Sequence, residues 1–306
     1  MNYLNQDVKQ QHITQPARDS ERSPHTLDQE KSRLSGKAEA PIGVFDSGVG
    51  GLTILSALRQ ELPYENYIYF GDTANCPYGT RSDAEIIELS IQVGRFLIEQ
   101  GVKLIVVACN TASQAALKSL RATFTSIQFV GVVPAVRSAA RDTKKGRIGI
   151  ATTNHAANAD YLKQLIEDYA ESSGIQAFPV GCPELVTLVE QGEIDGFAVE
   201  ETVKQALHPI LKEDVDVIVL GCTHFPALRS VIEHVTNHKI HIIDSSNAVA
   251  RRTHYVLDAE RLIQPDNSNH AHIGNLKVWC SGDAEFFSYV ANKLLGYSIH
   301  VHQARL

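Results

Sequence analysis

The sequence predicts an α/β protein of two domains, each a mainly parallel sheet flanked by helices. Short apolar runs with the length of buried strands alternate with amphipathic helical patterns along most of the chain. Such alternation is typical of parallel sheets connected by helices. The strand candidates are too many for one comfortable sheet, so we expect two. Two matching cysteine motifs, one in each half of the chain, indicate that the domains are related by pseudo-symmetry.

The first half begins with a buried run, IGVF at 42–45, followed by a helical pattern with leucines along one face. Pro63 stops this helix. Ser82 and Glu85 form a capping box that begins a longer helix, and Gly101 ends it. A third helix is expected in ASQAALKSLRATF. The other strands of this half are expected at 67–70, 104–108 and 129–133.

The alternation continues through the second half of the chain. Strands are expected at 147–151, 175–180, 215–220, 239–243 and 276–280, with helices between them and after the last. The stretch 1–39 differs, because it is rich in Gln, Ser and charged residues of both signs. It has too few apolar side chains to offset the entropy of ordering, so we expect a disordered tail.

Composition excludes several classes of protein. The formal charge of −7 over 306 residues gives no basic bias toward nucleic acid. No apolar run approaches the length of a membrane span, and the polar N-terminus lacks the apolar core of a signal peptide. A cytoplasmic protein is therefore expected. The 5 cysteines form no C-x-x-C pair, which argues against a zinc knuckle and a disulfide framework.

Two cysteines stand where a strand ends and a helix is expected to begin: Cys109 in VVACNTAS and Cys222 in VLGCTHF. Ligands of open α/β sheets bind at the carboxyl ends of strands, where helix N-termini offer free N–H groups and partial positive charge. Both features favour a thiolate, so we expect lowered thiol pKa values. One such cysteine would more often be a buried structural thiol, but two in matching settings favour function. Nearby groups that could hold a small carboxylate are Asn110, Thr111 and Thr223.

A glycine-rich turn, FDSGVGG at 45–51, follows the first strand. It fails the dinucleotide fingerprint because Thr53 stands where Gly or Ala is required, and the chain contains no P-loop. The turn alone could be structural. Asp46 within it is more informative, because a strand-end carboxylate beside a thiol can share or tune a proton. In CPYGTRS, Pro77 and Gly79 predict another turn, from which Tyr78 could present its hydroxyl.

Together these motifs resemble the glutamate racemase family. GVFDSGVGGL, PYGTRS, VVACNTAS, GVVPA, VLGCTHFP and IDSSNAVARR match that family in order and spacing, over residues 40–306. The resemblance implies a racemase that needs no cofactor or metal and supplies D-glutamate for peptidoglycan. It also implies an active site in the cleft between two domains. We expect one domain over 40–134 and 247–306 and the other over 135–246.

The resemblance implies roles for individual residues. Cys109 and Cys222 would be the two acid–base residues, acting on D-glutamate and L-glutamate respectively. Asp46 would lie near Cys109, and His224 near Cys222. Glu190, in ELVTLVE, corresponds to an acidic residue of the family's site. The residues expected to line the substrate pocket are Asp46, Ser47, Tyr78, Gly79, Asn110, Thr111, Thr153, Thr223 and His224.

The chemistry agrees with this assignment. Racemisation removes the Cα proton from one face and returns a proton to the other, which two opposed acid–base groups achieve without moving the substrate. One must begin as thiolate and the other as thiol. The sequence also departs from the family: Ala156 stands where a second threonine is usual. The cysteines outside the catalytic motifs are expected to be structural; they are Cys76, Cys182 and Cys280.

Two other functions stay open at this point. Aspartate racemases also carry two cysteines but tend to have an acidic residue after the second Cys-Thr, where this chain has His224. The second alternative is a non-catalytic protein that binds an acidic metabolite. The presence of both cysteines argues against it. Some racemases with N-terminal extensions need the activator UDP-N-acetylmuramoyl-L-alanine, so the stretch 1–39 raises that question here. A homodimer is also left open.

Overall fold

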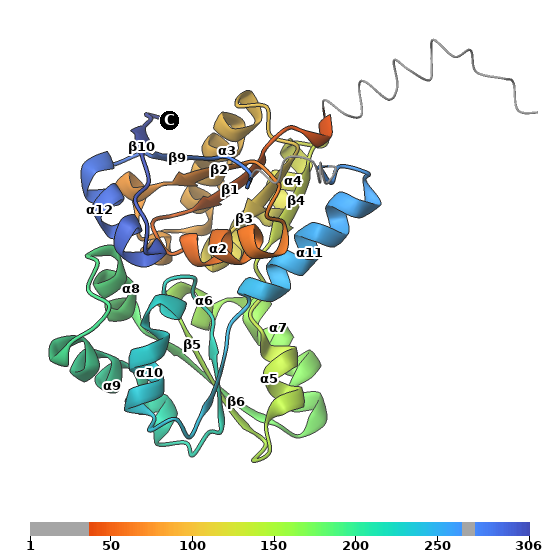
Figure 1. Ribbon diagram of the computed structural model, residues 1–306. Helices are drawn as coiled ribbons and strands as arrows, with labels where there is room; N and C mark the ends of the chain where they lie inside the picture. Colours follow the sequence, from red (N-terminus) through yellow and green to blue (C-terminus); the bar gives the residue numbers. More distant parts are fainter. Residues whose placement is uncertain (1–36, 265–272) are drawn as a thin grey trace, which may run out of the picture.

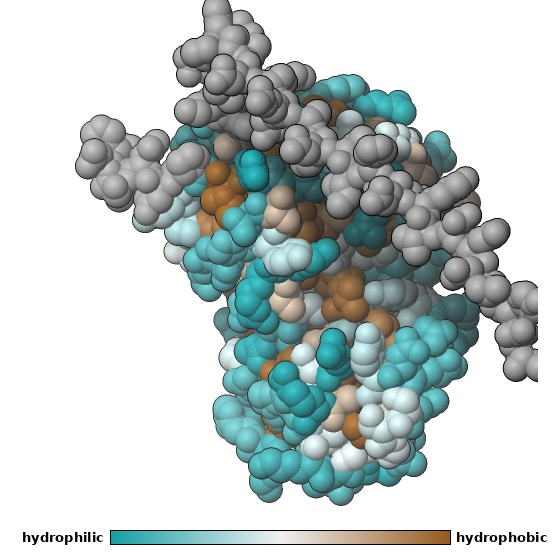
Figure 2. Space-filling model, turned by 90° about the vertical axis from the view of Figure 1, so that its right-hand side faces the viewer, coloured by the Kyte–Doolittle hydropathy of each residue, from teal (hydrophilic) through white to brown (hydrophobic). Residues whose placement is uncertain are grey.

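The computed structural model describes residues 37–264 and 273–306 and has two separate sheets, each covered by helices (Figure 1). Every strand pair within these ranges is parallel. The predicted α/β fold with two sheets is thereby confirmed. Figure 2 shows one face of the molecule, where hydrophobic residues are visible at the waist between the two parts.

The first sheet has six strands in the order β10-β9-β2-β1-β3-β4. Four come from the first half of the chain and two from its end: β1 (Ile42–Asp46), β2 (Tyr67–Gly71), β3 (Leu104–Val107), β4 (Gln128–Gly131), β9 (Leu276–Cys280) and β10 (Val301–Gln303). Its helices are α2 (Leu52–Glu61), α3 (Asp83–Glu99), α4 (Asn110–Thr123), α11 (Ser246–Ala259) and α12 (Ala284–Leu295). The chain therefore leaves this sheet after β4 and returns to it through α11.

The second sheet has four strands in the order β6-β5-β7-β8. They are β5 (Arg147–Thr152), β6 (Gln176–Gly181), β7 (Val217–Leu220) and β8 (His241–Ile243). The helices around it are α5 (Val136–Asp142), α6 (Asn154–Asn158), α7 (Asp160–Tyr169), α8 (Pro183–Glu190), α9 (Phe197–Leu211) and α10 (Arg229–Val235). Short 3₁₀ helices add single turns: η1 (Thr73–Asn75), η2 (Tyr78–Thr80), η3 (Glu171–Ser173) and η4 (Phe225–Leu228).

The predicted strands are all confirmed, to within two residues at either end. The capping box is also present: the Ser82 side chain accepts from Glu85 N, and Glu85 reaches back to the Ser82 backbone. Gly101 follows α3 with a φ of +77°, a conformation that favours glycine. The sequence did not reveal β10, whose three residues include two exposed polar side chains and hence no apolar run.

Apolar packing joins the two sheets on one side of the molecule. One cluster of buried side chains contains Leu52 of α2, Val189 of α8, Phe225 of η4 and Phe287 of α12. Elements of both sheets thus bury one another's apolar faces, while β1, β2 and β3 are buried along their whole length. None of the helices in the described ranges is both long and apolar enough to cross a membrane.

A buried ion pair closes the amino end of the first sheet. Lys103 and Glu65 have side chains only 2% exposed and lie within salt-bridge distance. The Lys103 ammonium also donates to the carbonyl oxygens of Ala38 and Leu262, and Glu65 accepts from the backbone N–H of Gln264 at 2.8 Å. Most of the expected tail, 1–36, lies outside the described residues, but Ala38 itself is buried.

We expect Lys103→Met to lower the free energy of unfolding by about 3 kcal/mol, because it leaves the Glu65 carboxylate buried and without its counter-charge. The exposed pair of Lys145 with Asp214 is the control, and Lys145→Met should cost less than about 1 kcal/mol. Urea denaturation measures both. Equal losses for the two variants would mean that the Lys103 pair contributes no more than a surface pair.

Candidate active site

The two strand-end cysteines line one small cavity, although they follow strands of different sheets. Cys109 comes just after β3, and Cys222 just after β7. The cavity has a volume of about 20 Å³, which is room for about one water molecule. A molecule larger than water can therefore enter only if residues around the cavity move. Its lining residues are Ser47, Pro77, Tyr78, Gly79, Cys109, Asn110, Thr111, Thr153, Val186, Cys222, Thr223 and His224.

The two cysteines differ in the helix that comes after each of them. Cys109 is the N-cap of α4, and its sulfur accepts from Ala112 N at 3.5 Å. Cys222 precedes the 3₁₀ helix η4, and α10 begins only at Arg229. The expectation that both cysteines open an α-helix is thus wrong for Cys222. Pro226 near the start of η4 provides a physical reason, because its nitrogen cannot donate a helical hydrogen bond.

Burial reverses the pKa shift that the sequence predicted for Cys109. Loss of solvation, and next the nearby Asp46 carboxylate, raise the pKa of the Cys109 thiol to about 12. The Ala112 N–H and the Ser47 hydroxyl, 3.8 Å from the sulfur, favour the thiolate but do not compensate. The prediction of a lowered pKa is therefore wrong here, and Cys109 is a thiol in this closed conformation.

Asp46 connects the two halves of the site. It is fully buried at the end of β1, where one carboxylate oxygen accepts from Gly48 N at 2.8 Å. The other accepts from the Thr223 hydroxyl at 3.0 Å, and Thr223 lies beside Cys222. Burial raises the pKa of Asp46 despite the opposing charge of His224. Asp46 is not among the residues that line the cavity, but its neighbours Ser47 and Thr223 are.

His224 lies between Cys222 and Glu190. Its Nδ1 is 3.6 Å from the Cys222 sulfur, and its Nε2 is 2.5 Å from Glu190 Oε1. Burial by itself lowers the pKa of His224, but hydrogen bonds to Cys222, Cys76 and Glu190 outweigh it and raise the pKa. Burial likewise opposes ionisation of Glu190, yet contact with His224 lowers its pKa overall. An imidazolium–carboxylate pair therefore stands behind Cys222.

The polar residues expected to hold the substrate meet in the cavity. Thr111 and Thr153, from the two halves of the molecule, have hydroxyl oxygens 3.3 Å apart. Asn110 Oδ1 is buried and, among the described residues, has no hydrogen-bond partner, so it is free to accept from a ligand. Tyr78 lines the cavity, but its hydroxyl donates to Asp72 at 2.6 Å, so that proton is not offered to a ligand.

Several contributors were not found in the sequence. Pro77 and Val186 line the cavity, and neither carries a chemical signal that separates it from a turn or core residue. Asp72 positions Tyr78 and follows β2 directly, the same strand-end placement that singled out Asp46. Glu190 was predicted but does not line the cavity; it contacts His224 and accepts from Val49 N at 2.8 Å.

The remaining cysteines divide into two kinds. Cys182 and Cys280 are buried in the apolar cluster, as the structural interpretation predicts. Cys76 is different, because its sulfur lies within 4.8 Å of ligand atoms of both His224 and Glu190. Cys76 also lines a larger pocket beside the cysteine cavity. The structural interpretation of Cys76 stays a prediction, and its proximity to His224 and Glu190 became visible only once the two halves were placed together.

An α/β protein with two thiols on one small cavity, beside polar residues such as Asn110 and Thr223, has the groups that acid–base chemistry on small molecules requires. Residues 52–253 match the family model described as Asp/Glu/Hydantoin racemase. This match covers two thirds of the chain, and a curated relative is 44% identical to it. The chain therefore belongs to this racemase family.

Curated and solved relatives agree with this membership. A glutamate racemase of Herpetosiphon aurantiacus is 44% identical over 252 residues, covering 82% of this chain and 96% of that protein. The crystal structure of a Bacillus anthracis glutamate racemase isoform superposes with a TM-score of 0.77 at 37% identity, covering 88% and 98%. The Escherichia coli glutamate racemase was solved with L-glutamate and the activator UDP-MurNAc-ala. It superposes with a TM-score of 0.74 at 35% identity, covering 86% of this chain and 97% of that chain. The resemblance seen in the motifs is thus confirmed.

Proposed function

We infer that the protein interconverts L- and D-glutamate by moving the Cα proton between Cys109 and Cys222. The observation that carries this inference is the placement of both thiols on one closed cavity, each from a different sheet. Relatives named glutamate racemase, covering more than four fifths of the chain, support the substrate.

The surroundings of the two sulfurs suggest which begins as the base. A protonated His224 donates from Nδ1 toward Cys222 and from Nε2 to Glu190, so both ring protons have acceptors. Such a contact supports Cys222 as the acceptor of the Cα proton. Cys109, with its pKa raised by burial, is the thiol. The resting enzyme is therefore prepared for L-glutamate: Cys222 takes the Cα proton, and Cys109 gives its own to the opposite face.

Turnover leaves the two cysteines with exchanged protons. Cys109 is then the thiolate and Cys222 the thiol, which is the form that acts on D-glutamate. Asp46 assists Cys109, since a buried carboxyl with a raised pKa can take part in returning the proton. The free Asn110 oxygen is placed to accept from the substrate ammonium. Racemisation needs no group from outside the chain in this scheme.

Substrate entry requires motion of the two domains, for which we propose the limits 40–134 with 247–306, and 135–246. The membership of the strands in the two sheets supports these limits. We also propose that the product serves peptidoglycan synthesis in the cytoplasm. The activator of the Escherichia coli relative supports UDP-N-acetylmuramoyl-L-alanine as an effector here. Light scattering would decide between a monomer and the homodimer.

Circular dichroism of the purified protein tests the activity directly. L-Glutamate, L-aspartate and L-alanine are each supplied without cofactor and with a chelator present, and the assay is repeated with the activator. We expect the signal to decay to zero for L-glutamate and to persist for L-alanine. Faster decay with L-aspartate would reassign the enzyme as an aspartate racemase, and no decay under any condition would favour a binding protein.

The glycine-rich turn provides a further test, because it packs directly on the helper residues. A Cβ on Gly50 would lie 2.4 Å from His224 Nδ1, so Gly50→Ala must displace the imidazole. We expect kcat/KM to fall about tenfold, since a shift well below 1 Å misaligns the proton path. A thermal melt should show a folded protein. Unchanged activity would mean that the position of His224 is not critical.

A further inference from the structure

Three side chains that could bind a metal ion lie close together beside the cysteine cavity. Cys76, Glu190 and His224 each offer one ligand atom, and the three atoms lie within 4.8 Å of one another. Cys76 follows η1 beside the first sheet, Glu190 ends α8, and His224 follows β7. The three groups therefore come from both halves of the molecule and meet only when these halves are together.

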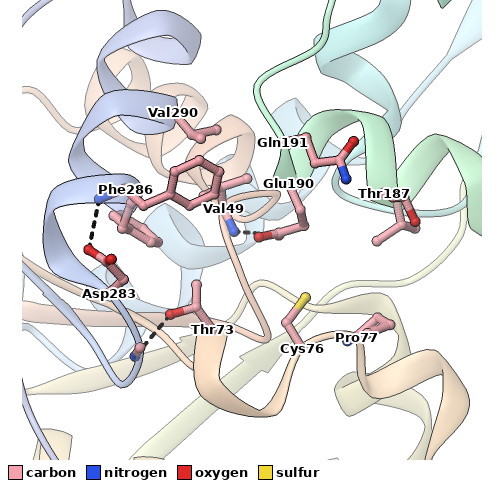
Figure 3. Close-up of a pocket in the computed structure, with 13 residues that line it drawn as sticks. Val49, Thr73, Cys76, Pro77, Thr187, Glu190, Gln191, Asp283, Phe286 and Val290 are labelled. Atoms are coloured by element: carbon pink, nitrogen blue, oxygen red, sulfur yellow. Dashed lines mark hydrogen bonds between the residues drawn. The ribbon is translucent and has the colours of Figure 1, made fainter.

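Two of these three residues also line a larger pocket, which adjoins the cysteine cavity at Pro77 and Val186. A pocket of about 420 Å³ is lined by Cys76 and Glu190, together with apolar side chains that include Val49, Phe286 and Val290. Figure 3 shows the Cys76 sulfur and the Glu190 carboxylate pointing into this pocket from opposite walls. A small ion can therefore reach both groups without passing between the two catalytic thiols.

We propose that Cys76, Glu190 and His224 form a binding site for Zn²⁺, and that the bound ion inhibits the enzyme. Thiolate sulfur, imidazole nitrogen and carboxylate oxygen are the ligands that zinc binds in proteins. Three protein ligands leave the fourth tetrahedral position to water. Coordination replaces the Cys76 thiol proton and the His224 Nε2 proton, and both are released to solvent. The contact between His224 Nε2 and Glu190 widens to about 3.3 Å, the ligand separation in a tetrahedral site.

Inhibition follows from two properties of the site, and this step rests on the proposed function. The ion takes the Nε2 position of His224 and separates it from Glu190, so the imidazolium–carboxylate pair behind Cys222 is lost. It also joins Cys76 of one half to Glu190 and His224 of the other. Because the cysteine cavity of about 20 Å³ must open for an amino acid to enter, such a cross-link resists substrate binding.

The competing explanation for inhibition by zinc is capture of the ion by Cys109 and Cys222. Cys76→Ser separates the two, because it removes a ligand of the proposed site and leaves both catalytic thiols in place. Cys182→Ser is the matched control: it replaces a buried thiol that donates to the backbone carbonyl oxygens of Val180 and Ala206. Both variants are used as full chains and checked for folding by thermal melts.

Binding is measured with Co²⁺ as the optical probe, which substitutes for Zn²⁺ and reports thiolate ligation. The wild type and Cys182→Ser should bind one equivalent with a sulfur-to-cobalt absorption band, and Cys76→Ser should lack it. Zinc should inhibit the wild type and Cys182→Ser at the same concentration. The affinity of Cys76→Ser for zinc should be lower by about tenfold or more. No thiolate band in the wild type, or the same band in Cys76→Ser, overturns the site. A band without inhibition overturns only the inhibitory role. Because the cobalt spectrum needs no glutamate, failure of the proposed function would not affect it.

Discussion

Cys109→Ser and Cys222→Ser are each expected to lower kcat/KM for glutamate by about 10⁴-fold or more, in both directions. A serine hydroxyl keeps the size of the side chain but is a far weaker acid than a thiol, so one of the two proton transfers loses its carrier. Both sulfurs line the cavity, so each is placed to serve one of the two transfers. Polarimetry or circular dichroism with each enantiomer measures the loss.

Two controls make this result specific. Cys182→Ser should keep the activity of the wild type, because that thiol is buried outside the cavity. Thermal melts of the two catalytic variants should lie close to the wild type, since a hydroxyl fits the same space. A variant that loses less than about tenfold would remove its cysteine from proton transfer and leave one base to serve both faces.

Asp46→Asn and His224→Asn are expected to lower kcat/KM by about 10²-fold. The enantiomers have equal free energy in water, so the equilibrium constant is one, and kcat/KM must fall equally in both directions for any variant. The asymmetry appears instead in the step that limits the rate. The Asp46 charge acts on Cys109, and His224 contacts Cys222. Loss of each helper therefore slows one transfer more than the other.

The primary isotope effect detects this asymmetry. With Cα-deuterated D-glutamate, Asp46→Asn should raise the effect, because Cys109 becomes the slower base. With deuterated L-glutamate, His224→Asn should raise it through Cys222. Both substitutions keep the approximate size of the side chain, so packing should change little. Effects that rise for the opposite enantiomers would exchange the two helpers, and no rise in either case would make them substrate-binding groups only.

Most strands and the strand-end positions of Cys109 and Cys222 were predictable from the sequence, because both depend on local patterns. Buried strands such as IVV before Cys109 are nearly continuous apolar runs, and a parallel sheet places the polar residue after each of them at one edge. Asp72 also follows a buried strand directly, so the same pattern applies to it. The short edge strand β10 has no such run and gave no signal.

Other features depend on how the two halves pack, which no local pattern records. Cys76 is far from Glu190 and His224 in sequence and meets them only across the interface. The pKa of Cys109 is raised because the closed cavity excludes water, an effect that outweighs the helix N-terminus used in the prediction. Tyr78 was expected to offer its hydroxyl to a ligand, yet Asp72 accepts it instead.

The central claim is that two different thiols serve the two faces of Cα, and racemisation in heavy water tests it most directly. Each reaction starts from one protonated enantiomer and is stopped early, and both enantiomers are separated and analysed by mass spectrometry. With Cys109 and Cys222 acting in turn, the product carries deuterium at Cα from its first appearance, while recovered substrate carries little. Recovered substrate that exchanges as fast as product forms would mean that one base serves both faces, and would contradict the account.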